Sequence, residues 1–207
     1  MKTIFDEIDQ SAYLADKGIT VLSDPAKNMM DALRSLAGFR CILADPPWEQ
    51  GMMGKYQKHK RADKLEYPTM TLDEIKAMPI ADCALPECHL WLWTTNQFLR
   101  DGFDVMDAWG FKYLAPIHWI KPNGIGNYFV HVTQTILFGY REKCQFPYHR
   151  YAFNTVKANQ PKRHSEKPDE CYQLIESISP GPRLELFSRT PREGWTSWGN
   201  EVGICQA

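Results

Sequence analysis

Apolar and aromatic residues gather in five short runs along the chain. Runs of this length that are rich in branched and aromatic side chains predict β-strands. Pro116 interrupts the third run, and because proline has no amide hydrogen to donate, it predicts a sheet edge or a bulge there. The predicted strands cover residues 39–44, 89–95, 113–120, 133–140 and 183–188.

The segments between these runs carry helix signals. Thr71 and Glu74 have the spacing of a capping box, and Pro79 stops the helix that follows. Strands that alternate with helices indicate an α/β fold around a mostly parallel sheet. The predicted helices run from Asp24 to Gly38, from Thr71 to Pro79, from Asn96 to Trp109 and from Pro168 to Pro180, and residues 49–66 and 147–166 are predicted to be long loops.

The composition fits one globular domain over residues 1–207, because 207 residues with 43% hydrophobic content supply one sizeable core. The 24 basic and 25 acidic residues nearly cancel, so any nucleic-acid surface must be local. No apolar run has the length of a signal peptide core or a membrane span, which predicts a cytoplasmic protein without membrane association. The six cysteines lack paired C-x-x-C spacing, so we expect no metal site.

The first predicted strand runs directly into Asp45-Pro46-Pro47-Trp48. Two prolines stiffen the turn, and a carboxylate at the carboxyl end of a buried strand lies where α/β sheets bind ligands. The Asp45 carboxylate and the Pro46 carbonyl have the chemistry to accept both hydrogens of an amino group on an aromatic base, while Trp48 offers a stacking face. A rigid turn with a core tryptophan is the alternative interpretation of these four residues.

Further motifs follow in a fixed order, and together they resemble the messenger-RNA adenosine-N6 methyltransferases and their bacterial and phage relatives. The resemblance covers about residues 38–203 and leaves 1–37 as an N-terminal extension packed on the domain. It implies a Rossmann-like class I S-adenosylmethionine-dependent methyltransferase with helices on both faces of the sheet, and with the catalytic motif before the cofactor-binding motif. The motifs are residues 45–48, 67–70, 90–94, 167–170, 184–187 and 198–201.

The resemblance also implies roles for individual residues. Asp45, Pro46, Pro47 and Trp48 would be catalytic, and Trp48, Tyr67 and Lys167 would line the target-base pocket. The cofactor would contact Asp45, Lys167, Glu185, Arg189, Asn200 and Glu201. Two departures stand out: Glu201 replaces the glutamine usual in the eukaryotic enzymes, and the segment from Arg189 to Trp195 is shorter, so no cofactor contacts are transferred onto residues 190–194.

Two basic segments flank these motifs. Lys58, Lys60 and Arg61 follow the catalytic motif, and Arg163 and His164 precede Lys167. Such clusters are often only solvated surface, but their positions favour contact with substrate phosphates. We expect replacement of Lys58, Lys60 and Arg61 by glutamate to weaken substrate binding.

These patterns predict transfer of a methyl group from S-adenosylmethionine to adenine N6 in nucleic acid, with DNA expected. RNA is the first alternative, since the family includes RNA enzymes. A catalytically silent nucleic-acid-binding subunit and a cytosine-N4 methyltransferase are the others. The sequence is compatible with a homodimer or with a partner subunit.

Overall fold

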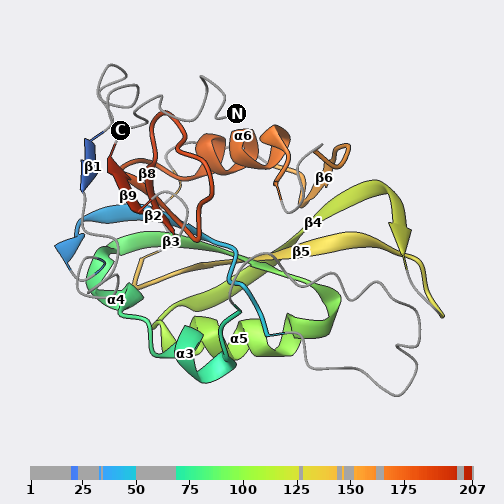
Figure 1. Ribbon diagram of the computed structural model, residues 1–207, viewed down its shortest axis with the longest axis horizontal. Helices are drawn as coiled ribbons and strands as arrows, with labels where there is room; N and C mark the ends of the chain where they lie inside the picture. The colour runs from blue at the N-terminus through green and yellow to red at the C-terminus, as the bar shows by residue number, and fades with distance from the viewer. Residues whose placement is uncertain are drawn as a thin grey trace, which may run out of the picture.

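The computed structural model describes residues 20–22, 33, 35–49, 69–125, 128–143, 146, 152–161, 166–199 and 203–206. These residues form one nine-stranded mixed sheet with helices on both faces (Figure 1). The strands are β1 (Thr20–Leu22), β2 (Phe39–Ala44), β3 (Ala84–Thr94), β4 (Lys112–Ile125), β5 (His131–Tyr140), β6 (Thr155–Lys157), β7 (Arg183–Leu186), β8 (Thr196–Gly199) and β9 (Gly203–Gln206). The helices are α3 (Leu72–Lys76), α4 (Ile80–Cys83), the 3₁₀ helix η1 (Asn96–Phe98), α5 (Leu99–Ala108) and α6 (Asp169–Ile178).

The strand order across the sheet is β1-β9-β8-β7-β2-β3-β5-β4-β6. Strands β8, β7, β2 and β3 are parallel neighbours at its centre, and antiparallel pairs lie on both sides of them. The carboxyl ends of the central parallel strands therefore meet at one edge of the sheet, which is where open α/β sheets bind ligands. The expected α/β fold is confirmed.

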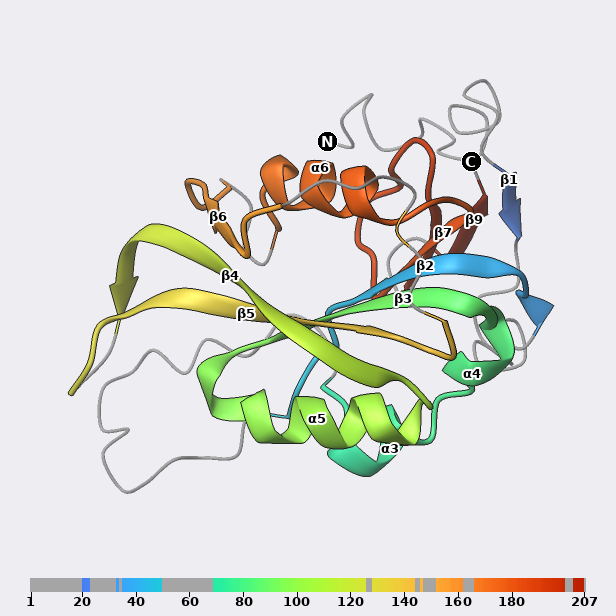
Figure 2. The ribbon, with the colours of Figure 1, turned by 180° about the vertical axis from the view of Figure 1, so that it is seen from behind.

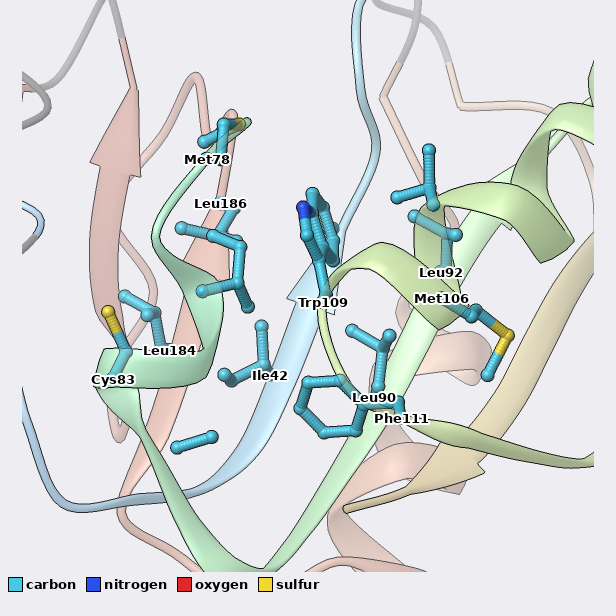
Figure 3. Close-up of a cluster of buried hydrophobic side chains, with 14 of the residues drawn as sticks. Ile42, Met78, Cys83, Leu90, Leu92, Met106, Trp109, Phe111, Leu184 and Leu186 are labelled. Atoms are coloured by element: carbon cyan, nitrogen blue, oxygen red, sulfur yellow. The ribbon is translucent and has the colours of Figure 1, made fainter. Parts of the chain in front are cut away.

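Helices α3, α4 and α5 cover one face of the sheet, and α6 covers the other (Figures 1 and 2). The alternation of side chains along β2 divides the core between them, because Ile42 and Ala44 join the cluster on the α5 face while Cys41 and Leu43 join the one on the α6 face. Figure 3 shows part of the α5-side cluster, where Trp109 packs beside Ile42, Leu90 and Leu186. Among the described residues, no helix combines the length and apolarity needed to cross a bilayer.

The structure changes several local predictions. Asn96 does not cap α5, because it lies inside η1 and its side-chain amide donates to Nδ1 of His131 at 2.9 Å. Strand β6 lies within the predicted loop 147–166, and the short elements α4, β1, β8 and β9 were not predicted. Pro116 behaves as expected, since β6 pairs with β4 only from His118 onward and the register with β5 shifts just before it. Most of the helix predicted before Gly38 lies outside the described residues.

Candidate active site

The Asp-Pro-Pro-Trp motif lies at the centre of the edge formed by the parallel strands. Ala44, the last residue of β2, pairs with Leu92 of β3 on one side and with Leu186 of β7 on the other. Asp45 therefore leaves the sheet between the ends of two neighbouring strands. This position results from strand order and places the motif beside the segments that follow β3 and β7.

Backbone hydrogen bonds hold the turn after β2 in one shape. The Trp48 amide donates to the Pro46 carbonyl at 2.9 Å, and the Met70 amide donates to the Pro47 carbonyl at 2.8 Å. Met70 directly precedes the capping box of Thr71 and Glu74, which is present as predicted. The motif is thus tied to the start of α3. Because a carbonyl oxygen has two lone pairs, the Pro46 oxygen can accept a second donor.

The Asp45 carboxylate forms an ion pair with Lys167. The Lys167 ammonium lies 2.6 Å from Asp45 Oδ2, with side-chain exposures of 12% for the lysine and 35% for the aspartate. The same ammonium lies over the Trp93 ring, 4.7 Å from its centroid. Lys167 is therefore held from two sides, whereas part of the Asp45 carboxylate faces solvent at the edge of the sheet.

A third charged group lies on the same face of the sheet. Glu185 pairs with Leu43 across β7 and β2, so it shares the α6 face with Asp45. Its carboxylate accepts a hydrogen bond from the Tyr172 hydroxyl of α6 at 2.7 Å. Burial raises the pKa of Glu185, although the Tyr172 hydrogen bond acts in the opposite direction. The carboxylate of Asp45 is close enough to raise this pKa further.

Arg192 covers this pair of side chains. Its guanidinium lies 3.7 Å from the centroid of the Tyr172 ring, and it forms a salt bridge with Asp169 at the start of α6. Burial raises the pKa of Tyr172, and the Glu185 carboxylate raises it further, so the phenol stays a hydrogen-bond donor at neutral pH. The α6 side of the site therefore combines the cations of Lys167 and Arg192, the carboxylates of Asp45 and Glu185, and a neutral phenol.

Trp48 lies on the opposite side of the motif and packs into the core. Its indole stacks on Phe98, with ring centroids 5.4 Å apart and an interplanar angle of 11°, and its Nε1 hydrogen points to the Trp93 carbonyl at 3.4 Å. Only 8% of the residue is exposed. As positioned, Trp48 offers a base only the small surface that Phe98 and the core leave free. Stacking on a target base stays a prediction.

The segment after β7 bends sharply beside Asp45. Phe187 has a left-handed φ of 64°, which is uncommon outside glycine and is often found at functional sites. Gly199 at the end of β8 is required there, because a Cβ atom would lie 2.2 Å from the Ser188 carbonyl oxygen. The bend places Ser188 and Arg189 at the edge that carries the motif.

The structure brings together three of the predicted site residues, Asp45, Lys167 and Glu185, and places Arg189 after β7. It also supplies contacts that sequence reasoning missed. One is the contact between the Trp93 ring and the Lys167 ammonium, because no sequence signal connected these two residues. Predicted site residues outside the described part of the chain are Lys58, Lys60, Arg61, Tyr67, Arg163, His164, Asn200 and Glu201.

Comparison with known proteins agrees with this architecture. Residues 39–201 match the MT-A70 family. The chain is 31% identical to the putative N(6)-adenosine-methyltransferase MT-A70-like of Medicago truncatula over 81% of the chain but 27% of that protein. It is 30% identical to the Type II methyltransferase M.MunI of a Mycoplasma species over 79% of the chain and 78% of that protein. The human N(6)-adenine-specific methyltransferase METTL4 is 29% identical over 93% of the chain and 43% of its own length.

Proposed function

Because the chain belongs to the MT-A70 family of S-adenosylmethionine-dependent methyltransferases, we propose that it methylates the exocyclic N6 amine of adenine in DNA. The observation that carries this proposal is the Asp45–Lys167 ion pair at the carboxyl end of β2. Asp45 offers a partly exposed carboxylate and is followed in sequence by the Pro46 carbonyl, and the Lys167 ammonium lies beside the carboxylate. The Asp45 carboxylate and the Pro46 carbonyl can accept hydrogen bonds from an aromatic amine, and the Lys167 ammonium can bind an anionic group.

The donor set on the α6 face fits S-adenosylmethionine. The amino-acid end of this cofactor carries one ammonium and one carboxylate, and Asp45 and Lys167 present the complementary charges. Glu185, with its pKa raised by burial, and Arg189 extend the polar surface along β7, and Asn200 and Glu201 would complete it. When bound, S-adenosylmethionine supplies a methyl group on a positively charged sulfur, which is open to attack by a nitrogen.

Asp45 and Pro46 would prepare the adenine amine for that attack. The N6 lone pair is delocalised into the ring, so the nitrogen must become more tetrahedral and gain positive charge. Acceptors that hold its two hydrogens in fixed positions stabilise this charge. Since a carboxylate has two oxygens, Asp45 can hold Lys167 through Oδ2 and still accept a second donor. The hydrogen bond from the Trp48 amide keeps the Pro46 carbonyl in place, and the ion pair with Lys167 holds the Asp45 carboxylate.

We propose DNA as the polymer because the segment Trp198-Gly199-Asn200-Glu201 resembles the corresponding segment of the bacterial and phage members. The chain's match to M.MunI extends over most of both proteins. RNA is the alternative that the experiment must test directly.

The purified chain should be incubated with labelled S-adenosylmethionine and with DNA or RNA oligonucleotides of matched sequence, followed by nucleoside mass spectrometry. We expect N6-methyldeoxyadenosine. Asp45→Ala should lower turnover by about a hundredfold or more, the scale seen when one transition-state hydrogen-bond partner is lost. Label in N6-methyladenosine of RNA alone would reassign the polymer. Near-normal turnover by the Asp45→Ala variant would overturn the mechanism.

Calorimetry with S-adenosylmethionine separates an enzyme from a catalytically silent subunit. An enzyme binds the cofactor and loses affinity when Lys167 is replaced by methionine. A silent nucleic-acid-binding subunit would bind the oligonucleotide without measurable heat from the cofactor. The intact Asp45–Lys167 pair favours the enzyme.

A further inference from the structure

The hairpin formed by β4 and β5 extends past the edge that carries the candidate active site. Thr94, the last residue of β3, pairs with Thr135, so residues 131–134 of β5 lie beyond the end of β3. At about 3.3 Å per residue, this extension is about 13 Å long before the turn begins. Figures 1 and 2 show the hairpin reaching beyond the central strands on that side.

The tip of this hairpin exposes three consecutive apolar side chains. Tyr128 is 97% exposed, Phe129 78% and Val130 63%. Isolated exposed hydrophobic residues are common, but a contiguous aromatic group at the end of a projecting element marks a contact surface. Both strands below the tip are anchored, since His131 of β5 accepts the Asn96 hydrogen bond and Trp119 of β4 packs edge-on against Trp93.

The charge around the hairpin identifies the kind of partner. Between Asp107 and Glu142 the sequence contains no aspartate or glutamate. Of its basic residues, Lys121 lies toward the tip, whereas Lys112 and Arg141 lie at the opposite end of the hairpin. Lys121 lies over the Trp119 ring at 5.7 Å from its centroid, between the tip and the site. Burial lowers the pKa of Lys121, and the Lys167 ammonium is close enough to lower it further. Two lysines, Lys121 on the hairpin and Lys167 beside Asp45, therefore lie on the side of the site that faces the tip.

Exposed aromatic rings together with cations, and without carboxylates to repel phosphate, are the features of surfaces that bind single-stranded nucleic acid. We propose that Tyr128 and Phe129 form a stacking platform for an unpaired base of the same strand that delivers the target adenine, with Lys121 near its backbone. This inference rests on the proposed function and adds that the protein engages unstacked nucleotides beside the target. A base extruded from a duplex leaves neighbours that such a platform can stabilise.

The test uses the full chain and a fluorescein-labelled single-stranded deoxyoligonucleotide with one adenine, with binding followed by fluorescence anisotropy. The double variant Tyr128→Ala/Phe129→Ala should bind it about ten- to a hundredfold more weakly, because each stacked base contributes on this scale. Tyr128→Phe keeps both rings and should bind like the wild type. Leu114→Ala, which alters a half-exposed residue of β4 at the opposite end of the hairpin, is the matched control.

Three further measurements make the outcome specific. Calorimetry with S-adenosylmethionine should give the same affinity for the double variant and the wild type, and methylation should show a raised KM with kcat little changed. The loss of affinity should be smaller for a blunt duplex of the same sequence, whose bases are already stacked. An equal loss for single strand and duplex would overturn the stacking role.

Unchanged affinity of the double variant for the single strand overturns the proposal. If that variant also changes from dimer to monomer by light scattering, the tip is instead an interface between protein chains. Failure of the proposed function has a different signature, because the wild type would then leave adenine unmethylated whatever the tip variants do to binding.

Discussion

The Lys167 ammonium rests on the face of the Trp93 indole, 4.7 Å from the ring centroid, while it pairs with the Asp45 carboxylate. Trp93 is almost fully buried, and its Nε1 donates to the Gln134 side chain at 2.6 Å, so the ring is fixed in orientation. Its backbone carbonyl is also the acceptor for the Trp48 indole. One residue of β3 thus supports both sides of the motif.

The first prediction concerns Trp93 as a positioning residue. Trp93→Leu removes the cation–π contact, which contributes on the order of 1 kcal/mol, so cofactor affinity should fall roughly fivefold. Trp93→Phe also shrinks the buried ring but keeps an aromatic face for the ammonium, and should retain more of the affinity. Calorimetry with S-adenosylmethionine and the pH profile of kcat/KM provide the readout. If Trp93→Leu and Trp93→Phe have similar melting temperatures and lose cofactor affinity equally, Trp93 acts only by packing in the core.

The second prediction concerns the coupling between Asp45 and Lys167. Because the two groups are in direct contact, Asp45→Asn and Lys167→Gln should be non-additive, with a coupling energy of about 0.5–3 kcal/mol. The double variant should lose less affinity for S-adenosylmethionine than the sum of the two single losses. A double-mutant cycle on the calorimetric Kd measures this directly, and strictly additive effects would show that the two side chains act independently on the cofactor.

The third prediction concerns Glu185 and pH. Because burial raises its pKa, the folded protein holds this proton at pH values where the unfolded chain has lost it. The free energy of unfolding should therefore fall as pH rises from the ordinary carboxyl pKa of 4.5 through the raised value. Glu185→Gln cannot ionise but keeps an acceptor for Tyr172, so it should gain stability relative to the wild type over this range.

Urea unfolding of both proteins at a series of pH values checks this dependence. The difference between them should be small at low pH, where both states of the wild type are protonated, and should grow as pH rises. Glu142→Gln, at an exposed position after β5, is the control and should follow the wild type at every pH. A parallel pH dependence for Glu185→Gln and the wild type would contradict the role of burial.

The fourth prediction concerns the buried thiols. Burial raises the pKa of Cys41, Cys83 and Cys171 to about 12, and raises that of Cys88 as well. Since the thiolate is the reactive form, these four cysteines should resist a disulfide reagent in the native protein. We expect at most two of the six thiols to react rapidly without denaturant, and all six in urea. Rapid native reaction of three or more would show that the core opens readily.

Local patterns in the sequence predicted most of the architecture. The apolar runs located β2, β3, β4, β5 and β7, and the bulge near Pro116 followed from the missing amide hydrogen. Short elements such as α4, β6 and β8 were missed because four residues or fewer carry too little periodicity to recognise. Asn96 was misassigned because a tertiary hydrogen bond to His131 uses the side chain that a helix cap would need.

The sequence by itself determined that a carboxylate and two prolines follow a buried strand, because chain connectivity and proline stereochemistry act on neighbouring residues. Only the tertiary structure decided that Lys167 reaches Asp45, that Trp93 lies beneath that lysine, and that Trp48 packs on Phe98 rather than beside the carboxylate. These contacts depend on which strands become neighbours and which face each side chain takes. Hydrophobic pattern specifies burial, but it does not specify the partner that a buried or charged group will meet across the sheet.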